Sequence, residues 1–146
     1  MVNLGGRMSH VDFAAVQAGV FAQISADTDI KALIGAHIFD GVPPGVVPDL
    51  YLLIGPELVI DKSDFTHSGS EHQLLISALS RGHGFKEAKR LAGFVVNALH
   101  AKPPNLDQGR VVFVHFSKAN AWRDPQLDAR RVDVTFLLRC AQDDAL

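Results

Sequence analysis

The sequence GFKEAKRLAGFVVNALH, residues 84–100, decides the fold class because it is a clear helix between two groups of predicted strands. Its apolar residues recur every three or four positions on one face, and its charged residues occupy the other face. This pattern predicts an amphipathic helix that packs through one side. Pro103-Pro104 cannot continue it. The apolar stripe is Phe85, Ala88, Leu91, Ala92, Val95 and Leu99.

Two strands are predicted after this helix. Residues 110–117 alternate, with Val111, Phe113 and His115 on one side and Val112, Val114 and Phe116 on the other. Residues 132–140 also alternate, with one apolar face that ends at Cys140. The polar stretch between them, Ser117 to Arg130, is predicted to be a long loop. It contains the only tryptophan, Trp122.

Two helices and two strands are predicted before it. Apolar residues at helical spacing indicate a helix from about Val11 to Ser25, with a capping box at Ser9 and Asp12. Asp27 or Thr28 can cap a short helix that ends at Gly35. Strands are predicted at 50–54, resuming at 57–60 after Gly55-Pro56, and at 71–80. The connector 41–48 and the polar segment 61–70 are predicted to be turns.

This order predicts a single α+β domain: an antiparallel-rich β-sheet of about four strands with two long helices on one face. Residues 1–8 are expected to be a flexible leader, residues 9–141 the domain, and residues 142–146 a frayed acidic tail. The second sheet face would be apolar and partly exposed, which usually indicates a partner. Its candidate residues are Leu75, Leu79, Val112, Val114, Phe116 and Leu137.

Composition excludes several classes of function. The formal net charge of −2 does not favour a protein that grips nucleic acid through a basic surface. The single cysteine, Cys140, allows no internal disulfide and fits the cytosol. No apolar run approaches the roughly 20 residues that a membrane helix needs. The start of the chain lacks the basic-then-apolar pattern of a signal peptide.

No catalytic or metal-binding pattern emerges from the sequence. His67 and His72 lack the spacing of zinc ligands and are interpreted as loop and strand-surface residues. Ser70 lies outside a G-x-S-x-G turn. Asp61 and Asp64 lack the dense oxygen spacing of a calcium loop. Cys140, on an apolar strand face, is expected to be a buried, inert thiol. We therefore expect no enzyme activity, no metal and no cofactor.

The basic loop around Trp122 is the best contact candidate, because Trp and Arg are enriched at interface hot spots. It contains Lys118, Arg123, Arg130 and Arg131. An alternative of equal weight is a tryptophan that covers the sheet edge, with solvated arginines around it.

The whole chain, from about Val11 to Arg139, resembles the tail terminator, or tail-completion, family of long-tailed phages and gene transfer agents. The most specific stretch is DTDIKALIGAHIFDGVPPG followed by PDLYLLIGPE. Two departures exist: Pro48 and Tyr51 are separated where the family has Pro-Tyr, and Leu79-Ser80 replaces an aromatic-Ser pair. The matching positions are Gly35, Ile38, Asp40, Pro43, Pro48, Gly84, Glu87, Ala88, Ala98, Leu99, Arg123 and Asp124.

The resemblance implies a structural virion protein, similar to the phage lambda tail terminator. Six copies would form a ring that caps the tail tube, stops its polymerisation and receives the head connector or stopper, with DNA only in transit through the hole. The protein would be assembled in the bacterial cytoplasm and end in the particle at the head-proximal end of the tail, without membrane contact. Under this reading we expect Asp61, Asp64 and Glu71 to face the lumen, and Phe65, Trp122, Arg123 and Arg130 to make subunit or tube contacts.

Three alternatives remain open at this point. Another head–tail connector or stopper would share the ring but would not limit tube growth. A small enzyme or ligand-binding domain would have a deep pocket with converging polar groups. A nucleic-acid-binding module using the Trp122 loop would bind DNA in a salt-sensitive way, which the net charge disfavours.

Overall fold

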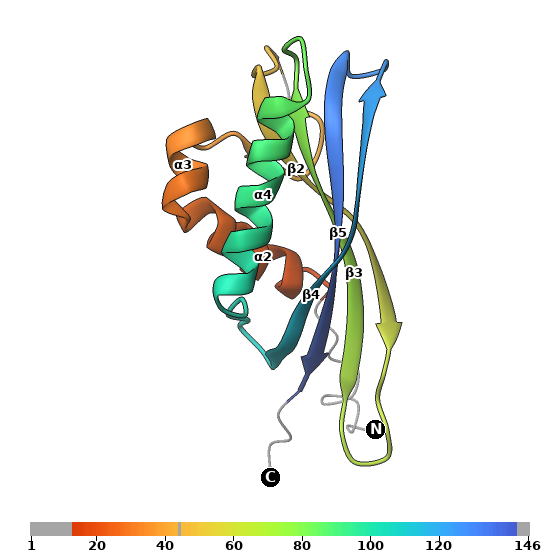
Figure 1. The fold of residues 1–146 in the computed structure, drawn as a ribbon. Helices are drawn as coiled ribbons and strands as arrows, with labels where there is room; N and C mark the ends of the chain where they lie inside the picture. The colour runs from red at the N-terminus through yellow and green to blue at the C-terminus, as the bar shows by residue number, and fades with distance from the viewer. Residues whose placement is uncertain (1–12, 44, 143–146) are drawn as a thin grey trace.

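The protein is an open five-stranded sheet with three helices on one face, as the computed structural model shows for residues 13–43 and 45–142 (Figure 1). The strands are β1 (Ile38–Phe39), β2 (Leu50–Asp61), β3 (Gly69–Ser80), β4 (Arg110–Asp124) and β5 (Ala129–Ala141). The helices are α2 (Ala15–Ala26), α3 (Thr28–Ile34) and α4 (Lys86–Ala101).

The strand order across the sheet is β1-β2-β3-β5-β4. β2, β3, β5 and β4 are antiparallel to their neighbours, whereas β1 runs parallel to β2 over two residues only. The α+β class and the antiparallel-rich sheet are thus confirmed, but the sheet is mixed and has five strands instead of four. β1 is too short to produce an alternating sequence pattern.

The core lies between the helices and one sheet face. α4 buries six residues toward the sheet, five of which were predicted in its stripe; Phe85 instead precedes the helix at its N-cap. α3 begins after Asp27, whose carboxylate accepts a hydrogen bond from the N–H of Ile30, and ends before Gly35. Both features of α3 were predicted.

α2 begins later than the sequence suggests. Its first residue is Ala15, and its N-cap Ala14 makes no side-chain capping bond. The predicted capping box at Ser9 and Asp12 lies outside the described residues. α2 carries no charged residue, although Ala18, Phe21 and Ala22 on its outer side are exposed.

β2 and β4 differ most from the predictions. β2 is a single strand that passes through Gly55-Pro56 by a bulge opposite β3. β4 continues to Asp124, so the predicted long loop is wrong: only the four residues 125–128 connect β4 to β5. The polar stretch forms a strand because its backbone pairs with β5 all along the hairpin. Its side chains are largely exposed, so it needed no apolar face.

Bulges in β4 also change which residues face the helices. The register with β5 skips Val112 and Ser117, and each extra residue reverses the alternation. Val114 and Phe116 therefore lie on the helix side, opposite Leu138 and Phe136, and not on the second face as predicted.

The two hairpins lie at opposite ends of the sheet. The β2–β3 hairpin reaches beyond the helical layer at one end, and the β4–β5 hairpin closes the other end (Figure 1). No helix in the described part of the chain is long and apolar enough to cross a membrane.

Candidate functional site

A polar network fixes the sheet face opposite the helices, near the β4–β5 hairpin. Asp133 accepts hydrogen bonds from Ser77 Oγ at 2.6 Å, from Trp122 Nε1 at 2.7 Å and from Arg131 Nε at 2.8 Å. Arg131 also donates to Asp124 at 2.8 Å and to Ser77 Oγ at 2.8 Å. The network therefore joins β3, β4 and β5 through side chains alone.

Asp124 anchors this network to the hairpin. Burial alone would raise its pKa, but hydrogen bonds from Arg131 and from the backbone N–H groups of Leu127 and Gln126 hold the pKa below its usual value. The same backbone bonds close the turn after β4. Asp124 therefore both orders the turn and neutralises the half-buried Arg131.

Trp122 belongs to this network and is not a free surface side chain. The guanidinium of Arg131 lies 5.2 Å from the centre of the Trp122 ring, and 38% of Trp122 is exposed. The ring forms a rigid, partly accessible platform of the kind used at interfaces. Trp122 thus lies on the edge strand β4 and packs against Arg131 of β5, which is paired and only 14% exposed, while part of the Trp122 ring stays accessible.

The two other predicted basic contacts are occupied within the chain. Arg130 donates to the carbonyl of Gly82 at 2.7 Å and lies over the Phe85 ring, so it braces the loop before α4. Arg123 pairs with Asp128 across the hairpin at 3.1 Å, with both side chains mostly exposed. The geometry does not bring Arg130 into one cluster with Trp122.

The rest of this sheet face is partly covered by the chain itself. Tyr51, Leu79 and Ala129 form a small buried cluster, against which Phe39 and Val47 pack. Leu79 is fully buried there, so its predicted exposure is wrong. Leu75 and Leu137 are intermediate in burial, and Val112 is exposed. The exposed part of this face lies toward the β2–β3 hairpin.

The β2–β3 turn is acidic and carries a fully exposed aromatic residue. Asp64 accepts hydrogen bonds from the N–H groups of Thr66 and His67, and these bonds lower its pKa. The pKa of Asp61 is lowered by its bonds with Ser63. Both carboxylates are thus exposed and ionised at neutral pH. Phe65, between them and His67, has no burial at all. Glu71 lies on β3 beyond the turn and is only intermediate in burial.

A second polar cluster lies on the helix side of the same hairpin. His72 is 3% exposed and pairs through Nδ1 with Glu57, while Nε2 lies 3.0 Å from Ser70 Oγ. The sequence interpretation of His72 as a strand-surface residue is therefore wrong, whereas His67 is exposed in the turn as predicted. The cluster links β2 to β3 where the hairpin leaves the helical layer. No group of three metal-ligating side chains occurs among the described residues.

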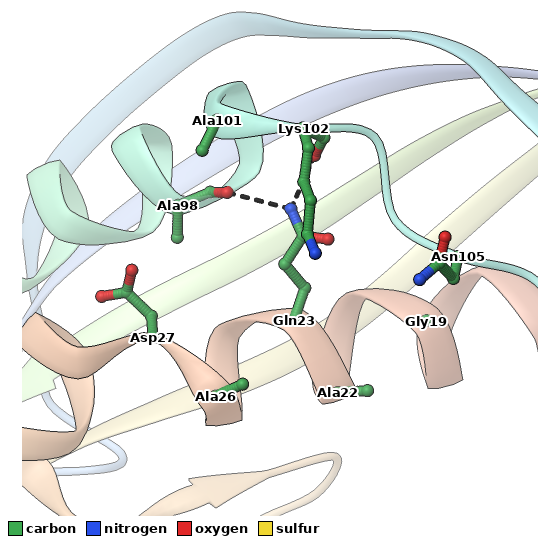
Figure 2. A pocket seen from close by; sticks show the side chains of 9 residues that line it. All are labelled: Gly19, Ala22, Gln23, Ala26, Asp27, Ala98, Ala101, Lys102 and Asn105. Atoms are coloured by element: carbon green, nitrogen blue, oxygen red, sulfur yellow. Dashed lines mark hydrogen bonds between the residues drawn. The ribbon is translucent and has the colours of Figure 1, made fainter.

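A groove of about 420 Å³ lies between α2 and the end of α4 (Figure 2). Gln23 spans it and donates to the carbonyls of Ala98 and Lys102, which satisfies groups that a helix end leaves unpaired. The charged residues of its lining are Asp27, which caps α3, and Lys102. Figure 2 shows small side chains around most of the groove. Its lining is Gly19, Ala22, Gln23, Ala26, Asp27, Ala98, Ala101, Lys102 and Asn105.

Cys140 is buried as predicted, and burial raises its pKa to about 11, with a smaller effect from the Glu57 carboxylate. A thiol in this state is a poor nucleophile. The polar groups described above brace strands, turns and helix ends. This arrangement, with an open-edged sheet, is typical of a protein of the assembly class.

Comparison with known proteins identifies that class more closely. A family model described as "Tail completion protein gp17" matches residues 18–141, so the chain belongs to this family. The chain is also similar to a solved chain in a structure described as "Virion of native gene transfer agent (GTA) particle", at 39% identity and a TM-score of 0.82. That match covers 88% of this chain and 96% of the other. A comparison with curated proteins gives no match.

The predicted family is thereby confirmed, and with it the placement of the chain in a virion tail. The polar network on the sheet face opposite the helices is called the far-face network below, and two of its residues, Ser77 and Asp133, were not among the predicted site residues. A signal for them was available: Arg131 and Asp133 alternate on one face of the last strand, and Ser77 lies within the apolar third strand.

Proposed function

We propose that this protein is a ring-forming tail terminator. Six copies cap the finished tail tube, stop its polymerisation and join it to the head connector, and DNA passes through the ring. The single observation that carries the proposal is a sheet with helices on one face and two edges that have no further strand in the described part of the chain, which belongs to the tail completion family. Closed rings need heterologous contacts between two different surfaces of one subunit, and two such edges offer them.

The two hairpin ends suit the two rims of such a ring. With the strands running roughly along the ring axis, the β2–β3 turn reaches one rim and the β4–β5 turn reaches the other (Figure 1). Phe65 would then contact the tube or the connector at one rim, and Trp122 with Arg123 would do so at the other. Arg130 supports these contacts indirectly, by holding the loop before α4.

The acidic turn suits a passage for DNA. Asp61, Asp64 and Glu71 are proposed to face the lumen, where negative charge prevents the DNA from adhering while it moves. Replacing Asp61 and Asp64 by Lys should strengthen DNA binding and reduce DNA delivery by assembled particles. Asp29→Lys, on the outer surface of α3, is the matched control and should change neither. Unchanged DNA binding by the variant with Asp61→Lys and Asp64→Lys would show that the turn does not face the lumen.

The function itself is tested by adding the purified protein to polymerising tube protein and measuring tube lengths by electron microscopy. A terminator should shorten the tubes and appear as a six-fold ring at one end. Another connector or stopper would leave the length distribution unchanged. Tubes of unaltered length, with no ring at their ends, would refute the proposal.

The Phe65 contact can be tested in the same assay. Phe65→Ser should leave stability unchanged, because the side chain is fully exposed, and should weaken tube or connector binding. Val46→Ser is a matched control, since Val46 is 94% exposed on the connector between β1 and β2. Equal binding by both variants would exclude Phe65 from the rim contact.

A further inference from the structure

The sheet has two edges whose backbone groups lack a neighbouring strand within residues 13–43 and 45–142. β4 is one outer strand along its whole length. On the other side, β1 pairs only with Leu52 and Leu53, which leaves Glu57–Asp61 of β2 as a second edge. Unpaired strand edges are templates for pairing with another chain.

Exposed large apolar side chains of the sheet are found on these two strands. Leu58 on β2 is 54% exposed, and Val112 and Phe116 on β4 are 47% and 44% exposed. The central strands β3 and β5 carry no such residue among those described. Apolar side chains beside an open edge make that edge a favourable place for a second strand.

The two edges also have opposite charge. Residues 110–118 of β4 include Arg110 and Lys118 and no acidic residue, whereas Glu57–Asp61 contains two acids and no base. Glu57 is turned toward His72, so Asp61, at the end of this edge, supplies its exposed negative charge. A β4 edge facing a second β4 edge would be repelled, and so would two β2 edges. Complementarity therefore favours β4 against β2.

The strand directions permit this pairing. β2, β3, β5 and β4 alternate in direction, so β2 and β4 are antiparallel to each other. A second copy placed in the same orientation beside the first would bring its β2 alongside β4 as an antiparallel neighbour. This contact joins two different surfaces, as closure into a ring requires.

The bulges of β4 define the pairing segment. Val112 and Ser117 interrupt the regular strand, which leaves the four residues 113–116 between them. Within one subunit, His115, Leu137, Gln73 and Leu58 lie in one row across the sheet. If two adjacent copies lie at the same level along the ring axis, His115 of one copy therefore lies opposite Leu58 of the next.

We propose that residues 113–116 of β4 pair with Glu57–Ile60 of a second copy of this chain, forming a continuous sheet across the subunit boundary. This inference rests on the proposed ring. It assigns the subunit contact to backbone hydrogen bonds between strand edges, supported by Leu58, Val112 and Phe116.

Disulfide cross-linking on capped tubes tests this pairing. In a Cys140→Ala background, chains carrying Leu58→Cys are mixed with chains carrying His115→Cys, assembled on tubes and oxidised. We expect dimers to form only in the mixture. Within one chain the two positions are three strand spacings apart, about 14 Å, which is too far for a disulfide. The chain that carries both substitutions should give a series of disulfide-linked oligomers on a non-reducing gel, up to the closed ring.

Controls separate this inference from the proposed function. Asn97→Cys, exposed on α4, replaces His115→Cys as the matched control and should not cross-link with Leu58→Cys. Cross-linking by either single variant alone would indicate a two-fold contact and overturn the edge pairing. Rings seen by electron microscopy without the mixed cross-link would overturn the pairing and leave the terminator function intact. If tubes mixed with the unmodified protein show no ring at their ends, the edge pairing and the terminator function are both overturned.

Discussion

Removing the carboxylate of Asp133 should destabilise the fold strongly, because it is the acceptor shared by three strands. Its side chain, 16% exposed, accepts from Ser77, Trp122 and Arg131. In Asp133→Ala these donors lose their acceptor, although Arg131 keeps its pair with Asp124. Removing one partner of a buried pair costs about 3–5 kcal/mol. Since one ion pair survives, we expect a loss of about 2–4 kcal/mol in the free energy of unfolding.

The measurement is denaturant unfolding followed by circular dichroism and by the fluorescence of Trp122, the only tryptophan. The control is Arg123→Gln, which breaks the exposed hairpin pair with Asp128 and should cost no more than about 0.5 kcal/mol. If Asp133→Ala costs as little as the control, the network does not hold the sheet together and the reasoning is refuted. Thermal unfolding should show a fall of about 6–12 °C for Asp133→Ala and almost none for the control.

Three further predictions concern stability and reactivity. Gly19→Ala should destabilise by about 1–3 kcal/mol in thermal unfolding, because its new Cβ would lie 2.6 Å from a backbone oxygen. Gly93→Ala should stabilise α4 by about 1 kcal/mol, because no atom lies within 4 Å of the new Cβ. If Gly19→Ala proved more stable than Gly93→Ala, the close packing of α2 at Gly19 would be contradicted. Cys140 should react with a thiol reagent at pH 8 only on unfolding, and fast labelling of native protein would contradict its burial. The lowered pKa of Asp124 contributes stability that is present above its unfolded pKa, about 3.9, and is lost as pH falls through the lower folded value. Arg131→Met should therefore weaken this contribution and move the midpoint of acid unfolding to higher pH. An unchanged midpoint would show that the Arg131–Asp124 pair does not stabilise the fold.

The helices were predictable because their signals are local. The cap at Asp27, the end at Gly35 and the stripe of α4 are set within a few residues, and the structure has them where expected. Phe85 was predicted in the apolar stripe of α4 but is not part of it, because it is the N-cap residue just before the first helical turn. It packs under Arg130 from a distant strand, and a local periodicity cannot show such a partner.

The strands were less predictable because their faces depend on neighbours. The second half of β4, rich in polar residues, is a strand only because β5 satisfies its backbone. The bulge at Val112 reversed the faces of the following residues, and no sequence pattern marked it. Ser77 and Asp133 are far apart in the sequence, and only the pairing of β3 with β5 places them side by side.

Stability and association are located in different parts of this molecule. The main core lies between the helices and the sheet, and the far-face network braces the end near the β4–β5 hairpin. The exposed apolar residues Leu58, Val112 and Phe116 lie on the two open edges, and Leu58 is the most exposed of the three at 54%. Substituting Leu58 should therefore leave the free energy of unfolding within about 0.5 kcal/mol of the parent protein. A ring built through these edges should lose its stability with the same substitution, whereas a ring built elsewhere should not. The comparison of unfolding with ring formation, made on Leu58→Ser, thus distinguishes a surface kept for a partner from one that only completes the fold.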